Sequence, residues 1–395
     1  MKPRGDDLLV LMPTLTAQRF PDGSLGLTTK FVDGVEEYLK YWSGRVQVLM
    51  EPSEKKSANL DNARFRLESL PFEVEIVDYT SPELGRHLEE AAIVHCAASH
   101  RQNRVADLCL SLCVPCVYGT EYSLRTRMQI VDSGTSSKLL RIRRYVWAAH
   151  QELRQRRAIE HAAGVQCNGT PTFDAYKRIS PRPHLFFDTR TRRADLISET
   201  LLEARIERLM RGEKLRLAFT GRLARIKGAH ILPAIADALR SRGVAFELAI
   251  CGGGELVQSM ESDIERLLLR DCVLMKGVLD FKAELVPFVK ENVDLFVCTH
   301  LQGDPSCTYL ETLACGVPII GFDNEAFAGL MRRVDAGWLV PMNDVSVMAE
   351  QIAVLDATRH AIAKASRHAR RFASEHTFEA TFERRVEHLR ECRSR

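Results

Sequence analysis

Two cations follow a strand-like run in the stretch FTGRLARIKGAHIL (219–232), the strongest local signal for chemistry in the sequence. The predicted strand ends at Gly221, and Arg222 and Lys227 flank a short loop before a helix. Arginine offers a planar fork, lysine a mobile point charge, and the helix N-terminus partial positive charge, so the loop suits a diphosphate. A basic turn in solvent is the alternative.

Three glycines in CGGGEL (251–256) separate another predicted strand from a helix. Glycine here, with Gly253 at the centre, lets backbone approach a ligand closely or simply makes a tight turn. The pattern is not GxGxxG, and the acidic ribose-binding residue expected about 20 residues later is not evident. A dinucleotide site is therefore disfavoured, and a plain strand–helix turn remains the alternative.

The stretch THLQGDPSCTYLETLACGVPIIGF (299–322) places a polar loop between a strand and a helix. The loop contains Gly303 and Asp304, and the helix carries Glu311, which can accept hydrogen bonds from a ribose diol. The first helical turn would present free amides to anionic oxygens. We expect these amides at Ser306, Cys307 and Thr308. An ordinary solvated glutamate is the alternative for Glu311.

Alternating apolar runs and helical patterns must position these loops, and this order is typical of parallel α/β architecture. Strands are predicted at 8–13, 45–51, 72–79, 91–97, 114–119 and 164–169, and then at 215–221, 246–251, 273–278, 294–300 and 317–322. Helices are predicted at 27–41, 81–90, 101–111, 138–162, 229–241, 255–269, 281–289, 306–314 and 344–355.

The two halves therefore predict two doubly wound Rossmann-like domains. We expect an N-terminal domain over 1–190, a C-terminal domain over 191–375 and a final helical segment over 376–395. A basic, proline-bearing stretch at 180–198 is predicted to link the domains. Because ligands bind beyond the carboxyl ends of parallel strands, two facing sheets would enclose a cleft.

Composition excludes several other classes. The chain has 395 residues, 45% hydrophobic and 27% charged, which is the balance of a globular protein with two cores. Its 55 basic and 52 acidic residues nearly cancel, which disfavours nucleic-acid binding. No secretory signal or membrane-spanning run is evident. The eleven cysteines lie mostly in apolar runs and indicate reduced, buried thiols rather than a metal site or disulfides.

The residues from 215 to 356 resemble the nucleotide-sugar-binding domain of GT-B glycosyltransferases, specifically the retaining family 4. GRLARIKG is similar to the family's GRL…KG element, and YLETLACGVPII resembles LEAMACGxPVV. GWLVPMNDVSVMAEQI (337–352) resembles the segment that follows. The resemblance implies that Arg222 and Lys227 hold the donor diphosphate and that Glu311 binds the donor ribose.

One departure from the family pattern concerns the donor sugar. The family commonly shows Glu-x7-Glu, with the first glutamate near that sugar, but Gly303 stands at this position. The neighbouring carboxylate of Asp304 can replace it, or the loop can hold the sugar through backbone amides and Ser306.

The N-terminal half resembles the family's acceptor domain only loosely. FPDGSLGLTTKF (20–31) takes the place of the family's glycine-rich loop, which implies that Gly23 and Gly26 approach the donor phosphates. IVHCAASH (93–100) implies that His95 or His100 lines the cleft. Glu121 can orient an acceptor hydroxyl. The alternatives are a satisfied core histidine and a solvated loop glutamate.

The segment 123–160 holds nine Lys or Arg against three Asp or Glu. Its helical part combines cations with apolar residues and can lie on an anionic membrane surface. The alternative is a helix whose apolar face packs on the core and whose basic face is solvated.

The resemblance implies a retaining transfer of sugar from a UDP- or GDP-sugar to an acceptor hydroxyl, with no metal or further cofactor. The expected acceptor is a sugar, a lipid-linked molecule or a small molecule, and the expected location is the cytoplasm, including the inner membrane face. Rivals are a nucleotide-sugar epimerase or hydrolase of the same shape, a dehydrogenase, which the missing GxGxxG disfavours, and a non-catalytic nucleotide-sugar-binding protein.

Overall fold

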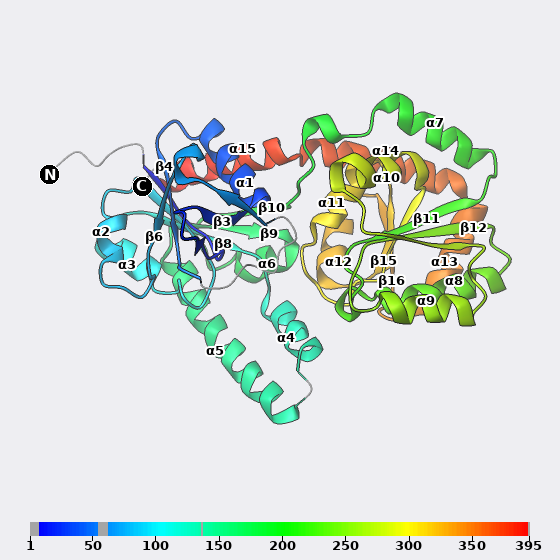
Figure 1. Ribbon diagram of the computed structural model, residues 1–395, viewed down its shortest axis with the longest axis horizontal. Coiled ribbons are helices and arrows are strands. Elements are labelled where there is room, and N and C mark those ends of the chain that lie inside the picture. Colours follow the sequence, from blue (N-terminus) through cyan, green and yellow to red (C-terminus); the bar gives the residue numbers. More distant parts are fainter. Residues whose placement is uncertain (1–7, 54–61, 136, 394–395) are drawn as a thin grey trace.

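The structure is a computed structural model that describes residues 8–53, 62–135 and 137–393. Two α/β lobes lie side by side, the first built from the first half of the chain and the second from the second half (Figure 1). The last helix returns from the second lobe to the first (Figure 1). Within the described ranges, no helix is both long enough and apolar enough to cross a bilayer.

The N-terminal lobe contains a seven-stranded parallel sheet in the order β10-β9-β8-β7-β1-β4-β6. The interior strand β1 pairs Leu9 with Val46 of β4 on one side and with Ile93 of β7 on the other. The strands are β1 (Leu9–Met12), β4 (Val46–Met50), β6 (Glu73–Ile76), β7 (Ile93–Ala97), β8 (Cys116–Thr120), β9 (Gly164–Asn168) and β10 (Pro183–Phe186).

The C-terminal lobe contains a six-stranded parallel sheet in the order β13-β12-β11-β14-β15-β16. Helices cover both of its faces, so β14 and β15 are buried throughout and β11 and β12 at all but one residue each, and these four strands read as mostly apolar runs. The strands are β11 (Leu215–Thr220), β12 (Phe246–Cys251), β13 (Val273–Gly277), β14 (Leu295–Cys298), β15 (Ile319–Phe322) and β16 (Gly337–Val340).

The helices lie between the strands, as in other parallel α/β proteins. In the first lobe they are α1 (Thr29–Tyr41), α2 (Leu84–Leu88), α3 (Val105–Ser111), α4 (Leu124–Ser133), α5 (Lys138–His161) and α6 (Gly169–Tyr176). The others are α7 (Glu199–Met210), α8 (Leu232–Ser241), α9 (Val257–Arg266), α10 (Val286–Asn292), α11 (Cys307–Ala314), α12 (Glu325–Met331), α13 (Val345–Ala357), α14 (Arg359–Glu375) and α15 (Phe378–Arg393).

Helix α15 completes the core of the N-terminal lobe. Its apolar residues Phe382 and Val386 are buried in one cluster with residues of α1, β1 and β4. A Cβ on Gly34 of α1 would lie 3.3 Å from the Phe382 ring, so glycine allows the two helices to approach closely. The chain thus returns to the first lobe after building the second.

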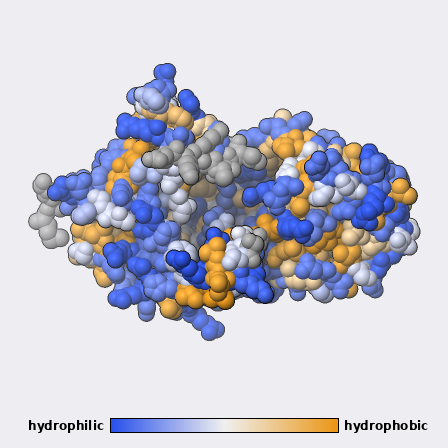
Figure 2. Space-filling model, turned by 60° about the horizontal axis from the view of Figure 1, so that its bottom comes forward, coloured by the Kyte–Doolittle hydropathy of each residue, from blue (hydrophilic) through white to orange (hydrophobic). Residues whose placement is uncertain are grey.

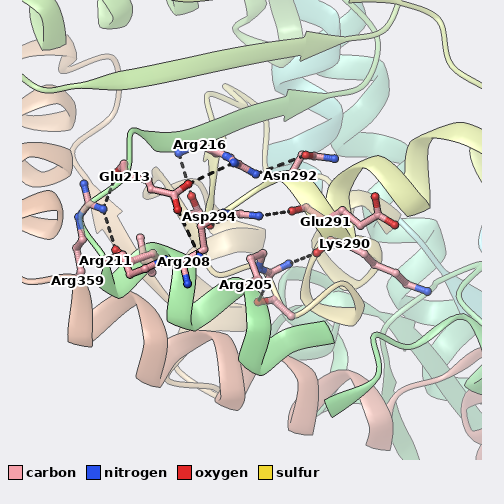
Figure 3. Close-up of polar contacts among 12 residues, drawn as sticks. Arg205, Arg208, Arg211, Glu213, Arg216, Lys290, Glu291, Asn292, Asp294 and Arg359 are labelled. Carbon is pink, nitrogen blue, oxygen red and sulfur yellow. Dashed lines mark hydrogen bonds and ion pairs between the residues drawn. The ribbon is translucent and has the colours of Figure 1, made fainter. Parts of the chain in front are cut away.

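A buried arginine fixes α7 to the second lobe. Arg205 donates to the carbonyls of Lys290 and Cys315, both at 2.9 Å, and also to the carbonyl of Gly316. Figure 3 shows Arg205 beside Arg208, whose guanidinium lies 3.3 Å from the carboxylate of Asp294. These contacts tie α7 to the segments before β14 and β15, at the sheet edge opposite the strands' carboxyl ends.

Two segments that were predicted as a loop and a linker contain β-strands instead. The expected loop at 20–31 is mostly a hairpin of β2 (Gln18–Arg19) and β3 (Leu25–Thr28), in which β3 also pairs with β5 (Asn62–Phe65). The expected linker at 180–198 contains β10, an edge strand that begins at Pro183. Proline is tolerated at the first residue of an edge strand but weakens the strand signal.

Candidate functional site

A cavity of about 850 Å³ opens at the carboxyl ends of β1, β7, β8, β9 and β10. Its walls combine aromatic or aliphatic side chains with titratable ones. The apolar lining includes Phe31, Val35, Tyr38, Phe186 and Phe382, and the titratable lining includes Lys30, His95, Glu121, Asp188 and Arg385. Such a mixture binds a ligand by its apolar faces and orients it by a few polar contacts.

The loop with the two predicted cations follows β11 in the second lobe. Lys227 lies 2.8 Å from the carboxylate of Asp304, and both side chains are largely buried. The Thr299 hydroxyl donates to the carbonyl of Lys227 at 3.1 Å, and the amide of Leu301 donates to the carbonyl of Ile226 at 3.1 Å. The structure therefore brings together the first and third motifs predicted from the sequence.

Glycine makes this contact possible. Gly228 has φ 66°, and a Cβ there would lie 1.9 Å from the carbonyl oxygen of Thr299. Gly252 similarly packs on Gly221, because a Cβ on Gly252 would lie 1.9 Å from the carbonyl oxygen of Gly221. A Cβ on Gly253 would lie 2.9 Å from Val278. The CGGGEL glycines thus allow close packing of backbone beside the cationic loop.

Arg222 is exposed next to Gly221, at the carboxyl end of β11. Its charge acts on Tyr122, which lines the cavity in the first lobe. Burial raises the pKa of the Tyr122 hydroxyl, the carboxylates of Glu121 and Asp304 raise it further, and Arg222 acts in the opposite direction. Charged groups of both lobes therefore converge around Tyr122.

A three-residue contact joins the lobes at the start of α11. Lys30 of α1 lies 2.5 Å from Asp188 and 3.3 Å from the sulfur of Cys307. The Cys307 thiol donates to Asp188 at 3.3 Å. Burial works against the charge on Lys30, but Asp188 and Cys307 outweigh it and hold the pKa of Lys30 above its usual value. Burial raises the pKa of the Cys307 thiol, so the sulfur stays protonated.

The remaining α11 residues are also placed near this junction. The amide of Ser306 donates to the carbonyl of Asp304 at 2.8 Å, so the expectation of a free amide does not hold for Ser306. Thr308 is half-buried in the first turn. Glu311 accepts a hydrogen bond from Arg190 at 2.9 Å, and the Arg190 guanidinium lies 4.0 Å from the centre of the Phe281 ring.

Helix α4 of the first lobe holds the loop that contains Gly303. Gln129 accepts a hydrogen bond from the Gly303 amide at 3.0 Å, and Thr126 donates to its carbonyl at 3.0 Å. Ser123 donates to Glu325 at 3.0 Å, and a Cβ at position 303 would lie 2.9 Å from the Glu325 Cβ. A glutamate at 303 would therefore collide with α12.

Of the site residues predicted in the N-terminal half, two line the cavity and the others lie outside it. His95 lines the cavity, and its Nε2 is buried without a partner among the described residues. Burial, with Arg385 and His388 adding to it, lowers the pKa of His95 well below its usual value, so the ring is neutral. Glu121 also lines the cavity, and desolvation followed by the charge of Asp188 raises its pKa.

His100, Gly23 and Gly26 are not among the residues that line the cavity. The His100 ring packs edge-on against Trp147 of α5, with centroids 5.4 Å apart. Gly23 has φ 81° in the hairpin turn, and Gly26 sits inside β3 opposite Gln18. Their glycine character serves the hairpin, because a Cβ on Gly26 would lie 3.3 Å from the Phe20 ring.

Sequence reasoning missed Lys30, Asp188, Arg190 and Gln129. Lys30 lies in the first turn of α1, and the next two fall in the predicted linker. Lys30 falls inside the predicted loop 20–31 but was not singled out there, and the partners of Lys30, Asp188 and Arg190 lie 119 to 277 residues away in the sequence. The basic character of the stretch 180–198 was the signal that the sequence offered for Asp188 and Arg190.

A family model described as "Glycosyl transferases group 1" matches residues 203–371. WcaL of Salmonella typhimurium, which carries the name of a colanic acid biosynthesis glycosyltransferase, is 27% identical over 156 residues, or 38% of each chain. The 2-deoxystreptamine N-acetyl-D-glucosaminyltransferase of Streptomyces fradiae is 27% identical over 180 residues, or 44% of this chain and 41% of that one. The chain thus aligns with less than half the length of these relatives.

Solved structures resemble the whole chain. Anabaena HepE, crystallised with UDP, has a TM-score of 0.64 and 16% identity over 96% of this chain and 98% of its own. WaaG, a glycosyltransferase involved in lipopolysaccharide biosynthesis, has a TM-score of 0.58 and 13% identity over 96% and 98%. The predicted fold of two Rossmann-like domains in GT-B arrangement is confirmed.

Proposed function

Because this chain of GT-B fold carries a group 1 glycosyltransferase domain, we propose that it transfers a sugar from a nucleotide diphosphate sugar to an acceptor hydroxyl. One observation carries the proposal. The cationic loop after β11 and the polar loop before α11 meet through Lys227 and Asp304, beside a cavity in the opposite lobe. Donor and acceptor sites placed on facing lobes can bring two substrates into contact.

We propose a UDP- or GDP-sugar as the donor. Arg222 and Lys227 would bind the diphosphate. Glu311 would release its hydrogen bond from Arg190 and accept hydrogen bonds from the ribose hydroxyls instead. Position 303 holds a glycine where the family commonly has a glutamate, and Asp304 would contact the donor sugar in its place. Crystal structures of HepE with UDP and with UDP-glucose make uridine nucleotides the first to test.

The chemistry breaks the bond between the anomeric carbon and a β-phosphate oxygen and forms a bond from that carbon to the acceptor oxygen. The acceptor proton passes to the departing diphosphate. Negative charge grows on the diphosphate as the first bond breaks, and positioned cations stabilise it without reorganisation. In this proposal Arg222 and Lys227 supply that charge, so no metal or further cofactor is needed, and the family resemblance supports retention of configuration.

The acceptor would occupy the cavity. Its aromatic walls suit the apolar face of a sugar ring or cyclitol, and His95 and Glu121 offer polar contacts to hydroxyls. The names of two relatives, a colanic acid biosynthesis glycosyltransferase and a 2-deoxystreptamine N-acetyl-D-glucosaminyltransferase, support a hydroxyl-rich acceptor. We propose a cytoplasmic protein that works at the inner face of the membrane.

A thermal-shift screen tests the proposed donor site. The protein would be mixed with UDP-, GDP- and ADP-sugars, because a ligand that binds the folded state raises the melting temperature. Arg222→Ala and Lys227→Ala should each reduce the shift, and Arg270→Ala, an exposed arginine on the second lobe, should not. If no nucleotide sugar stabilises the protein, the proposed function fails. If the nucleotide sugar is converted without an acceptor, the protein is an epimerase or hydrolase and not a glycosyltransferase.

A further inference from the structure

One arginine of the last helix lies inside the cavity of the N-terminal lobe. Hydrophilic residues dominate the molecular surface in Figure 2, and a charged side chain there faces solvent. Arg385 of α15 instead lines the cavity, and its guanidinium carbon lies 4.3 Å from the centre of the Phe186 ring and 5.0 Å from that of Phe382. The centre of the Tyr38 ring is 5.3 Å away. Three aromatic rings therefore surround this cation.

Gln166 of β9 holds Arg385 in place. The Nε of Arg385 donates to the side-chain oxygen of Gln166 at 2.8 Å, and the side-chain nitrogen of Gln166 donates to the backbone carbonyl of Arg385 at 2.8 Å. Gln166 is fully buried in the sheet, so both the backbone and the guanidinium of Arg385 have a fixed anchor. A ligand that binds this guanidinium would not have to order it first.

The charge of Arg385 has no carboxylate partner. Over 8–53, 62–135 and 137–393, its guanidinium donates a hydrogen bond to Gln166 alone and forms no ion pair, which leaves both Nη groups without a protein acceptor. Of the carboxylates that line the same cavity, Asp188 is paired with Lys30 at 2.5 Å. A half-buried cation among aromatic rings is costly unless it is paired, so an anion from outside the chain would stabilise it.

Tyr38 and His95 line the cavity beside Arg385, and each carries an unpartnered polar atom. The Tyr38 hydroxyl and the Nε2 of His95 are buried and have no hydrogen-bond partner within the described part of the chain. Tyr38 is 5% exposed, and its ring centre lies 6.0 Å from that of His95. Burial raises the pKa of Tyr38, so its hydroxyl keeps the proton and can donate a hydrogen bond.

These groups lie away from the place where the lobes meet. Burial raises the pKa of Glu121, and Asp304 of the second lobe adds to the rise. The pKa values of Tyr38 and His95 are shifted by burial first and by Arg385 next, and no described residue of the second lobe contributes. Glu121 therefore marks the end of the cavity that faces the second lobe, and Arg385 marks the far end.

We propose that the acceptor carries an anionic group, a carboxylate or a phosphate ester, which binds the two Nη groups of Arg385 with the Tyr38 hydroxyl as a further donor. This proposal rests on the proposed function, in which the acceptor occupies the cavity. The planar guanidinium fork matches the oxygens of either anion, and the rings of Phe186 and Phe382 would contact the apolar face of the acceptor. Held at the far end, the anion would direct a hydroxyl of the acceptor toward the second lobe.

Isothermal titration calorimetry without nucleotide tests this proposal. The anionic probes are glucuronate and glucose-6-phosphate, and the controls are glucose, which lacks the charge, and inorganic phosphate, which lacks the ring. We expect at least one anionic probe to bind about tenfold or more tightly than either control, because a hydrogen bond to a charged group contributes roughly 10- to 150-fold in affinity. The tighter probe distinguishes the carboxylate from the phosphate ester.

Variants of Arg385 identify the group that binds the anion. Arg385→Gln should remove the preference for the anionic probe over glucose, and Arg385→Lys should keep only part of it, since lysine retains the charge and loses the fork. Arg157→Gln, at an exposed position of α5 outside the cavity, should leave the preference unchanged. Circular dichroism would show that the variants fold.

Tyr38→Phe gives a second readout that a structural role would not produce. It should weaken binding of the anionic probe by about tenfold. The melting temperature of the free protein should stay the same or rise, because the hydroxyl that is removed is buried without a protein partner. A lower melting temperature together with unchanged probe binding would assign the hydroxyl to the fold and contradict its role as a donor to the anion.

Three results would overturn the proposal. Glucose could bind as tightly as both anionic probes, inorganic phosphate could bind as tightly as the better of them, or the folded Arg385→Gln protein could keep the preference. The titrations are repeated with Arg222→Ala and Lys227→Ala combined, and loss of the preference there would place the anion on the cationic loop instead. No nucleotide sugar is present, so these failures are distinct from a failure of nucleotide sugars to stabilise the protein, which would refute the proposed function.

Discussion

Lys227 and Asp304 form an ion pair, and a donor diphosphate that binds Lys227 would have to displace Asp304 from it. The Nζ and Oδ2 atoms are 2.8 Å apart, and the side chains are 13% and 14% exposed. The Lys227 backbone is held separately by Thr299, so Lys227→Ala removes the ammonium group and leaves the loop in place. A hydrogen bond to a charged group contributes about 1.5–3 kcal/mol. We therefore expect roughly a 10- to 150-fold loss in affinity for the nucleoside diphosphate.

Asp304→Asn should act in the opposite direction on the same ligand. The substitution keeps the size of the side chain, but it removes a carboxylate that competes for Lys227 and repels the phosphates. We expect nucleoside diphosphate affinity to rise by up to about tenfold, or about 1.4 kcal/mol. Sugar transfer should fall, because Asp304 is proposed to contact the donor sugar.

Isothermal titration calorimetry with UDP and GDP would measure both effects. Lys364→Ala, an exposed lysine paired with Asp335 on the second lobe, is the control and should leave the affinity unchanged. The reasoning is refuted if Lys227→Ala binds the diphosphate as tightly as the wild type. It is also refuted if Asp304→Asn weakens binding as Lys227→Ala does.

Three further predictions concern stability. Gly228→Ala should lower the free energy of unfolding by more than about 2 kcal/mol, because the alanine Cβ would collide with Thr299. Gly243→Ala, at φ 72° with open space around it, should cost only about 1 kcal/mol. Urea titrations would measure both changes. Arg205→Met should cost at least about 3 kcal/mol, since three buried backbone carbonyls would lose their donor. An unchanged urea midpoint would contradict the role assigned to Arg205. Burial lowers the pKa of His184 from 6.5 to about 3, so the folded state binds fewer protons than the unfolded one and stability should fall as pH drops from 6.5 toward 3. His184→Gln should reduce that slope by up to about 1.4 kcal/mol per pH unit, measured by urea unfolding at several pH values, and an identical slope would contradict this.

The second lobe was predicted well from the sequence except for β16, which the sequence prediction did not include, and the reason for the success is physical. Its central strands are buried on both faces, so β11 and β12 read as apolar runs interrupted by one charged residue each, Arg216 and Glu247, with bounds close to the predicted ones. Glycines and cations directly after such runs must lie at the carboxyl edge of the sheet. The positions of Lys227 and Asp304 near each other follow from that rule.

The first lobe was harder because its site depends on distant contacts. Lys30 and Cys307 are 277 residues apart in the sequence, and only the packing of the two lobes brings them together. Asp188 falls in a stretch that was predicted as a linker, since Pro183 hid the strand before it. For α5, the periodicity predicted an apolar face, but it cannot show whether other residues cover that face.

Product analysis by NMR during turnover tests the central claim most directly. A nucleotide sugar that stabilises the protein would be incubated with hydroxyl-rich acceptors, and the anomeric proton of the product and the released diphosphate would be followed together. The account predicts that diphosphate release requires an acceptor, that one glycosidic bond forms per diphosphate, and that the product keeps the anomeric configuration of the donor. Diphosphate release at the same rate without acceptor, or an inverted product, would contradict it.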